Sequence, residues 1–318
     1  MEVLKLGNLI CQRGEKINGF LDIEGYEIPV TIINGKSYGK TIGISAGIHC
    51  CEYTGIQTAI ELAKELTPDN IIGTLIILHG SNYSGFFKRV PGVIPEDNKN
   101  LNRVFPGNKN GSLTEKIAYY FSNELYPKLD FFIDLHGGDT YENVMDFIYA
   151  PGIGDEKVIE FSHLTASALD LEYRVKSKSS TGAYNSAAIQ GVPGFLIEIG
   201  GMGIWSKEDV EKYKRNVRLA LEFLELLEAK ESLKRKVNQK MIVNAKYIDS
   251  PLNGFWYPKF NPGDKFKKDD IIGEIKNVFG EILKVYKAEF NGIILYETVS
   301  LAIEVGNPLI AYGEIQNS

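Results

Sequence analysis

Two short segments of the sequence place side chains that bind metals directly after predicted strands. In the first, His49 and Glu52 follow the apolar run Thr41–Ala46, where a helix is predicted to begin. Imidazole nitrogen and carboxylate oxygen are common zinc ligands, and this short spacing lets a single turn supply both. A His and a Glu at this spacing also occur by chance in many proteins, so the pair alone is weak evidence.

The second segment is Asp134-Leu135-His136-Gly137-Gly138, in which His136 ends a predicted apolar strand. Ligands in open α/β sheets gather at the carboxyl ends of strands, so we expect His136 to lie near His49 and Glu52. Two His and one Glu form the ligand set of a catalytic zinc ion with an open fourth position. The same set can also hold cobalt, manganese or iron.

Other residues compete for the metal. His79 also follows a predicted strand, but the aspartate and glycines that flank His136 favour His136 as the third ligand. His163 falls in a helical stretch, which indicates a packed or surface histidine. Cys50 and Cys51 are soft ligands that can bind zinc, yet packing in the core is the simpler interpretation.

Two further polar sites have the residue types for substrate binding and proton transfer. Arg103 follows Asn102 in the loop Asn100–Gly107, and an Arg beside an Asn suits a carboxylate because the guanidinium is a planar, two-pronged donor. Taken alone, this Arg fits a surface salt bridge equally well. Glu198 is the only charged residue in the apolar strand Gly194–Ile199. Burial would raise its pKa toward the range of a general base, although a buried structural ion pair also fits.

Taken together and in this order, the segments resemble the succinylglutamate desuccinylase/aspartoacylase family, whose fold is that of the zinc carboxypeptidases. The resemblance covers roughly residues 40 to 205, and the ordered set is far more specific than any one member. It rests on His49-x-x-Glu52, on NLNRVFPG at 100–107, on DLHGG at 134–138 and on Glu198 in PGFLIEIGG.

The resemblance implies a role for each of these residues. It implies one zinc ion per chain, held by His49, Glu52 and His136. It also implies that Asn102 and Arg103 hold a free carboxylate of the substrate, and that Glu198 is the general base and acid.

Two more assignments follow from the family pattern. An upstream Arg polarises the scissile carbonyl in the family, and Arg89 is the best candidate here, although its spacing to Asn102 is longer than in aspartoacylase. A substrate-facing Tyr precedes the catalytic Glu, and Tyr184 lies at about that position. The family's second substrate-binding Arg has no counterpart in this chain.

The elements that must position these residues form an α/β pattern. Strand-like and helix-like segments alternate up to about residue 235, which predicts a mixed, mainly parallel sheet flanked by helices, as in the zinc carboxypeptidases. The predicted strands are Thr41–Ala46, Gly73–Leu78, Phe131–Leu135 and Gly194–Ile199. The predicted helices are Gly55–Leu66, Ser112–Tyr126, Ile153–Ala168 and Glu208–Glu231.

The composition changes after residue 236. Short branched or aromatic segments then alternate with turn motifs about every ten residues, which predicts a small all-β domain. We therefore expect a hydrolase domain at 1–235 and a β domain at 236–318. The second segment resembles a lipoyl/biotinyl-like barrel, but its candidate hairpin tip, Glu289–Gly292, lacks the lysine of carrier domains. Its expected role is to cover the mouth of the site or to pack against another subunit of a homo-oligomer.

The composition limits the classes of partner and the cellular location that we expect for this protein. Of 318 residues, 44% are hydrophobic and 24% are charged, as in ordinary globular proteins, and the net charge of −6 argues against a nucleic-acid partner. We expect no membrane partner, because no apolar run approaches the ~20 residues of a membrane span. Three cysteines form no disulfide framework, and the N-terminus does not resemble a signal peptide, so the cytoplasm is the expected location.

The function implied by the resemblance is a zinc-dependent amidohydrolase. Its expected substrate is an N-acyl amino acid, or a similar small amide with a free carboxylate. Two alternatives remain open: a metallocarboxypeptidase that acts on peptide C-termini, and a non-catalytic protein that binds a small carboxylate.

Overall fold

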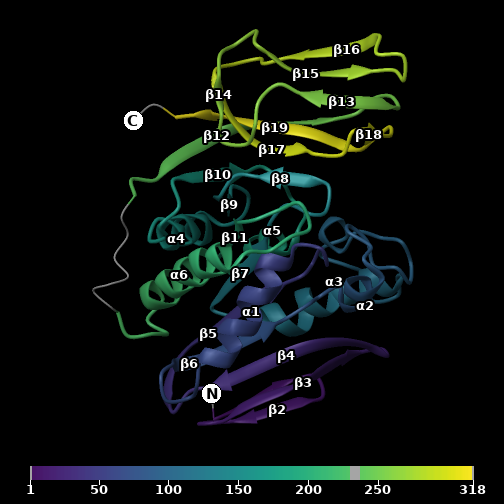
Figure 1. The fold of residues 1–318 in the computed structure, drawn as a ribbon. Coiled ribbons are helices and arrows are strands. Elements are labelled where there is room, and N and C mark those ends of the chain that lie inside the picture. The colour runs from purple at the N-terminus through teal and green to yellow at the C-terminus, as the bar shows by residue number, and fades with distance from the viewer. Residues whose placement is uncertain (1, 230–236, 317–318) are drawn as a thin grey trace.

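The computed structural model describes residues 2–229 and 237–316, and Figure 1 shows one large sheet with helices on both faces. A hairpin of β1 (Val3–Leu6) and β2 (Leu9–Gln12) lies at the N-terminal end. A third, four-stranded sheet lies at the other end of the molecule, in the C-terminal segment.

The large sheet has thirteen strands and runs through most of the described chain. Twelve of them follow one another in the order β14 (Lys265–Phe266), β17 (Gly292–Thr298), β19 (Pro308–Ile315), β12 (Lys240–Asp249), β10 (Tyr173–Ser177), β9 (Phe147–Pro151), β11 (Gly194–Glu198), β7 (Phe131–His136), β5 (Ser37–Ala46), β6 (Ile72–Leu78), β4 (Tyr26–Asn34) and β3 (Lys16–Ile23). The thirteenth, β8 (Glu142–Val144), pairs with β17.

The parallel part of this sheet lies in its middle. From β12 to β6 every neighbouring pair is parallel except β9 and β11, whereas the pairs toward both ends are antiparallel. The mixed α/β class predicted from the sequence is therefore confirmed. The prediction of a mainly parallel sheet holds only for this middle region, because the strands that extend the sheet at both ends pair antiparallel. In the run β11–β7–β5, the carboxyl ends of parallel strands meet at one edge, as functional sites in such sheets require.

Helices cover the two faces of this middle region. On one face lie α1 (Tyr53–Glu65), α4 (Glu156–Ala166) and α6 (Lys207–Phe223), which pack on alternate strand residues such as Ile133 and Leu135. On the other lie α3 (Leu113–Tyr120) and α5 (Ala183–Ile189), which pack with Phe132 and Leu196. This division follows from the alternation of side chains along a strand.

The remaining short helices lie in connections. They are α2 (Tyr83–Lys88), the 3₁₀ turn η1 (Leu101–Arg103), the π turn η2 (Phe121–Leu125) and the 3₁₀ turn η3 (Tyr126–Lys128). The helix predicted to end at Tyr126 thus changes pitch after Tyr120. Ser112 is its N-cap, as predicted, and forms a capping box with Glu115.

Other predicted boundaries shift by several residues. The helix predicted from Ile153 begins at Glu156, after the cap Asp155, whose side chain accepts from the Lys157 amide. The helix predicted to reach Glu231 ends at Phe223, and Glu231 lies outside the described residues. Strands β1 to β4 occupy a region for which the sequence analysis predicts no element.

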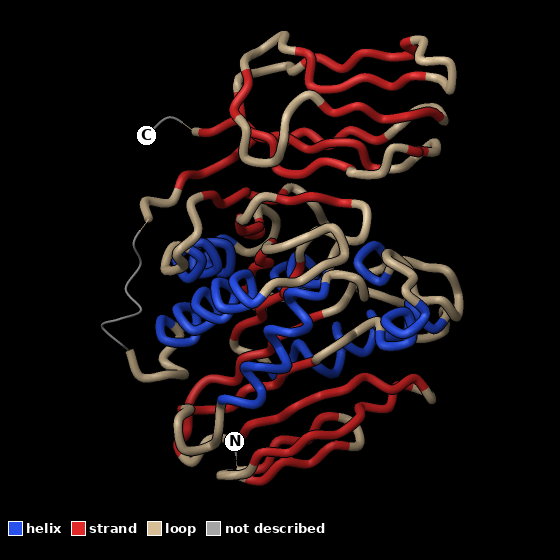
Figure 2. The backbone as a smooth tube through the Cα atoms, in the orientation of Figure 1, coloured by secondary structure: helices blue, strands red, loops and turns tan. Residues whose placement is uncertain are grey.

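All described elements from Lys240 onward are strands, in agreement with the predicted all-β segment (Figure 2). The four-stranded sheet has the order β16 (Ile282–Lys287), β15 (Ile271–Lys276), β13 (Gly254–Pro258) and β18 (Ala302–Ile303). It packs on β17 and β19 around a core of its own that contains Trp256 and Tyr312.

The C-terminal segment also extends the large sheet, because β12 pairs in parallel with β10. The predicted domain boundary at 235/236 lies outside the described residues. Both that division and the likeness to a lipoyl/biotinyl barrel stay predictions. No helix within the described ranges is long and apolar enough to cross a membrane.

Phe195→Ala is expected to lower the free energy of unfolding by about 3 to 5 kcal/mol, because it removes a fully buried ring from the centre of the core. Urea denaturation followed by circular dichroism measures the change. Phe279→Ala is the matched control: its ring is 86% exposed, so the expected change is within about 0.5 kcal/mol. Equal losses in the two variants would contradict this core.

Candidate metal centre and active site

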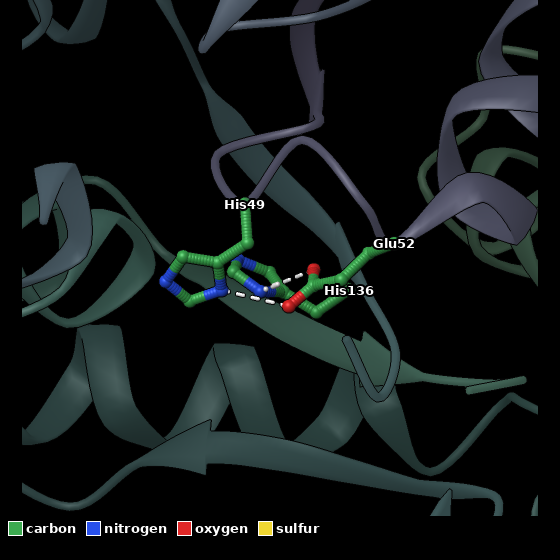
Figure 3. Close-up of side chains that lie close together, drawn as sticks. All are labelled: His49, Glu52 and His136. Carbon is green, nitrogen blue, oxygen red and sulfur yellow. Dashed lines mark hydrogen bonds and ion pairs between the residues drawn. The ribbon is translucent and has the colours of Figure 1, made fainter. Parts of the chain in front are cut away.

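The structure brings His49, Glu52 and His136 together at the edge where β5 and β7 end (Figure 3). His49 lies in the turn after β5, Glu52 is the N-cap residue of α1, and His136 is the last residue of β7. One ligand atom from each lies within 4.8 Å of the other two. Of the described residues, this is the only group of His, Cys, Asp and Glu side chains close enough to hold an ion.

Both imidazoles point the same nitrogen at the carboxylate between them. His49 Nδ1 lies 2.7 Å from Glu52 Oε1, and His136 Nδ1 lies 2.9 Å from Glu52 Oε2. Glu52 and His136 are buried and His49 is partly exposed, so the centre is open to solvent on the His49 side.

The other nitrogen of each ring faces an oxygen atom. His49 Nε2 lies 3.2 Å from Asn100 Oδ1, and His136 Nε2 lies 3.2 Å from Asp134 Oδ2. Asp134 is buried and also accepts a hydrogen bond from Ser45. The sequence predicts no role for Asn100, and Asp134 enters the prediction only as a motif residue, although both lie in segments that carry predicted site residues.

These contacts test whether the three residues suit a metal ion. A neutral imidazole carries one proton, and metal-bound histidines usually donate it to an oxygen acceptor on the far side of the ring. His49 Nε2 can donate a proton to Asn100 Oδ1, whereas His136 Nε2 and Asp134 Oδ2 lie close together without the alignment of a hydrogen bond. If each ring carries its proton on Nε2, both Nδ1 lone pairs face the Glu52 carboxylate, and a cation would stabilise the three converging electron-pair donors.

One buried atom supports this interpretation. Glu52 Oε2 has no hydrogen-bond partner among the described residues, although His136 Nδ1 lies only 2.9 Å away. These two atoms are near each other without the alignment of a hydrogen bond, as two ligands of one ion would be. By contrast, His49 Nδ1 and Glu52 Oε1 also meet the geometry of a hydrogen bond. Two His and one Glu suit zinc, so the donor set fits the ion expected from the sequence.

Glu52 and His136 strongly shift the pKa values of each other. Burial would raise the pKa of Glu52, but the imidazoles of His136 and His49 outweigh it and lower that pKa to about 2. Burial would lower the pKa of His136, but the carboxylates of Glu52 and Asp134 hold it well above its ordinary value. The carboxylate therefore stays ionised at neutral pH, as a metal ligand must. His136 favours its charged form in this environment and would release a proton when a metal binds.

Glu198 ends β11, directly opposite His136 in the parallel register of β11 and β7. Burial raises the pKa of Glu198 well above its ordinary value, and the carboxylates of Glu52, Glu142 and Asp134 raise it further, while His136 opposes them. A carboxyl group with a raised pKa is suited to exchange protons near neutral pH.

Two further acidic residues, Asp139 and Glu142, lie between the candidate centre and the C-terminal strands. Burial and the charges of Asp139 and Glu52 raise the pKa of Glu142 to about 7. Asp139 and Glu142 line a groove of about 820 Å³, whose other wall comes from the C-terminal segment, including Phe255 and Thr298. The C-terminal segment thus lines a groove beside Glu142, and its expected covering role stays a prediction.

Asn102 and Arg103 lie in η1 and differ in exposure. Asn102 is buried, and its Oδ1 accepts a hydrogen bond from the Ala183 amide at the start of α5. Arg103 is exposed. Burial raises the pKa of Tyr296 on β17, and the charge of the Arg103 guanidinium opposes this rise.

The other two predicted residues are not part of the group that could hold an ion. Tyr184 lies on α5 and is buried in the core, and its pKa is raised by burial while Ser177 and Asn185 oppose the rise. Arg89 is exposed at the end of α2 in a left-handed conformation (φ 55°). Its guanidinium lies near enough to Tyr53 to oppose the rise that burial causes in the pKa of that hydroxyl.

The competing ligands lie outside the centre. His79 Nε2 lies 2.8 Å from Thr31 Oγ1, and burial lowers the pKa of His79 to about 4. His163 is a packed helix residue whose Nε2 lies 3.0 Å from the Pro151 carbonyl oxygen. Cys50 and Cys51 are buried and free.

Comparison with known proteins agrees with this geometry. The sequence profile of the succinylglutamate desuccinylase/aspartoacylase catalytic domain matches residues 38–224, which carry all three ligands and Glu198. The chain belongs to this family. The resemblance inferred from four sequence segments is therefore confirmed.

Relatives of known identity extend the match to the whole chain. N-alpha-acetyl-L-2,4-diaminobutyric acid deacetylase of Halomonas elongata is 25% identical over 298 residues, which are 92% of this chain and 86% of that protein. The product-bound ectoine utilization protein EutE of Ruegeria pomeroyi has a TM-score of 0.86 at 24% identity, with 98% of each chain covered. A family member from Rhodobacter sphaeroides has a TM-score of 0.84 at 20% identity over 100% of each chain. The two structures show that the fold is shared.

Metal analysis of protein supplied with zinc should find one ion per chain in the wild type. The His136→Ala variant should lose it, because two ligands hold zinc much less tightly than three. His163→Ala is the matched control, since its ring packs against a backbone carbonyl away from Glu52. If His136→Ala kept the ion or His163→Ala lost it, the metal would lie elsewhere.

Proposed function

We propose that this family member is a zinc-dependent amidohydrolase that removes the acyl group from an N-acyl amino acid or a similar small amide with a free carboxylate. One observation carries the proposal. The convergent donors His49, Glu52 and His136 lie beside a carboxyl group, Glu198, whose raised pKa suits proton transfer. The proposed cofactor is one zinc ion per chain, held by these three donors.

The relatives support amide hydrolysis as the reaction class. The Halomonas protein is by name a deacetylase of an N-acetylated diamino acid, and the family profile is that of desuccinylases and aspartoacylases. All of these names describe removal of an acyl group from the nitrogen of an amino acid. A substrate of this kind also carries a free carboxylate.

Each side chain contributes a separate part of the chemistry. A zinc ion supplies Lewis-acid chemistry here, polarising a carbonyl and lowering the pKa of water. Glu198 takes the proton that the attacking water loses and passes it to the departing amine. Its position opposite His136 on the neighbouring strand keeps it beside the metal ligands throughout.

Asn102 and Arg103 are proposed to hold the substrate carboxylate. The Oδ1 atom of Asn102 is bonded to Ala183, which fixes the amide so that its nitrogen can donate to a ligand. Arg103 offers an exposed guanidinium, and a guanidinium binds a carboxylate through two parallel hydrogen bonds. Binding by this end orients the amide at the metal.

Arg89 and Tyr184 enter the proposal with weaker support. The guanidinium of Arg89 acts on Tyr53, the residue after Glu52, so we propose that it polarises the substrate carbonyl. Contact of Tyr184 with the substrate stays a prediction, because its side chain is buried in the core.

Glu198→Gln should lower kcat for N-acetyl amino acids by about 10² to 10⁴, because glutamine cannot take up the proton. Zinc content should stay at the wild-type level, since Glu198 is not one of the three ligands. Glu297→Gln is the matched control: burial raises the pKa of Glu297 to about 7 as well, but this residue lies on β17 in the C-terminal segment. A fully active Glu198→Gln variant would favour the non-catalytic alternative.

Arg103→Ala should lower kcat/KM for N-acetyl amino acids by about 10- to 100-fold, the cost of one lost charged hydrogen-bonding group. The corresponding amides, in which a carboxamide replaces the carboxylate, should react equally well with the variant and the wild type. Lys109→Ala removes an exposed cation from the same loop and serves as the control. An equal loss for both substrate types would contradict carboxylate binding, and faster cleavage of dipeptides than of N-acetyl amino acids would identify a carboxypeptidase.

A further inference from the structure

Tyr213 joins the two strands that carry the third metal ligand and the proposed base. It lies on α6, its side chain is 0% exposed, and its ring packs in the core between α6 and the sheet. The hydroxyl is the one polar group of this side chain, whose ring otherwise makes apolar contacts. That hydroxyl reaches backbone atoms of both β7 and β11.

Three hydrogen bonds define the position of this hydroxyl. The Tyr213 oxygen accepts from the His136 amide at 2.9 Å and lies 2.6 Å from the Ile197 carbonyl oxygen and 3.0 Å from that of His136. A hydroxyl has one proton to donate, and Ile197 is the nearer acceptor. The hydroxyl thus bridges the amide of the ligand residue and the carbonyl that precedes Glu198.

The strand register shows that the Tyr213 hydroxyl lies between two backbone groups that would otherwise bond to each other. His136 pairs with Glu198 in the parallel ladder, and the Ile199 amide donates to the His136 carbonyl at 3.3 Å. In such a ladder the other bond of His136 would run from its amide to the Ile197 carbonyl. The Tyr213 hydroxyl binds both of these groups, so it helps to determine how far apart the two strands lie at their ends.

Tyr213 acts from the opposite side of the sheet. Its ring belongs to the core that contains Leu135 and Ile197. Asp134 and His136 alternate with Leu135, so their side chains leave the sheet on the other face, where Leu196 also packs. Tyr213 is therefore shielded from substrate and can influence the reaction only through the backbone.

We propose that Tyr213 is a positioning residue, whose hydroxyl sets the spacing between the metal ligand His136 and the base Glu198. This inference rests on the proposed function for the roles of those two residues. Removing the hydroxyl leaves the His136 amide without this partner and lets the strand ends shift. Partners one step removed from a metal ligand typically contribute about 10- to 100-fold to metal affinity or activity.

Tyr213→Phe tests this directly, because it removes one oxygen atom and keeps the ring. In zinc-saturated protein, kcat for an N-acetyl amino acid should fall about 10- to 100-fold, while KM stays within about twofold of the wild type. Zinc affinity, measured by chelator competition, should weaken about tenfold. Incorporation of 4-aminophenylalanine at position 213 restores a hydrogen-bonding group and should recover most of the activity. If the Phe variant folds poorly, this second variant still shows whether a hydrogen-bonding group at this position is required.

Tyr312→Phe is the matched control. Tyr312 is also fully buried, and its hydroxyl accepts from the Glu289 amide at 3.4 Å, but it lies in the C-terminal core. Its kcat and zinc affinity should stay at the wild-type level even where its melting temperature falls as much as that of Tyr213→Phe.

The outcomes separate this inference from the proposed function. An active wild type with an equally active Tyr213→Phe variant would overturn the role of Tyr213 and leave the proposed function intact. An equal loss of kcat in Tyr213→Phe and Tyr312→Phe would also overturn it. If the wild type cleaved no amide, the proposed function would fail, and zinc affinity would then decide the inference: about tenfold weaker supports it, and unchanged overturns it.

Discussion

A neutral imidazole has one proton for two nitrogen atoms, and the architecture of this site depends on that limit. Asn100 Oδ1 lies 3.2 Å from His49 Nε2 and can accept a proton from it. Asp134 Oδ2 lies 3.2 Å from His136 Nε2, although these two buried atoms lack the alignment of a hydrogen bond. With the ring protons on Nε2, as metal-bound histidines usually have them, the Nδ1 lone pairs face the Glu52 carboxylate. The proposed metal centre therefore depends on the oxygen atoms behind the histidines as well as on the three proposed ligands.

The sheet makes this arrangement possible. Parallel β5, β7 and β11 end at one edge, so a turn after β5, the last residue of β7 and the last residue of β11 meet without a long loop. The N-terminus of α1 adds Glu52, and the hydroxyl of Tyr213 on α6 reaches the backbone between β7 and β11 from the far face. The C-terminal strands continue the same sheet through β12 and border the groove beside Glu142. The proposed ligands and base thus lie at or next to the ends of strands, and the C-terminal segment lines the groove beside Glu142.

Much of this site is predictable from the sequence because its signals are local. A polar residue that ends an apolar strand marks the carboxyl edge of a sheet, as His136 does, and Glu198 stands out as the one charged residue of an apolar strand. Neither signal is decisive alone, and their order along the chain makes them specific. The partners of the rings are harder to find, since Asn100 lies 51 positions from His49 and joins it only through the fold. Tyr213 has no sequence signature at all, because a tyrosine that bonds to backbone looks like any core tyrosine.

The strands at the two ends of the large sheet show a different limit. In β4, Tyr26, Ile28, Val30 and Ile32 alternate as a strand requires, so the local sequence does carry a signal for this strand, which is missing from the predicted elements. The pairing of β12 with β10 joins segments far apart in the chain, and local periodicity cannot connect them.

Crystallography of the zinc-supplied protein, with data collected on both sides of the zinc absorption edge, tests the central claim most directly. The account predicts one anomalous peak among His49 Nδ1, His136 Nδ1 and the Glu52 carboxylate, with the Nε2 atoms still facing Asn100 and Asp134. A peak at any other place, no peak, or rings turned so that Nε2 points to Glu52 would contradict it.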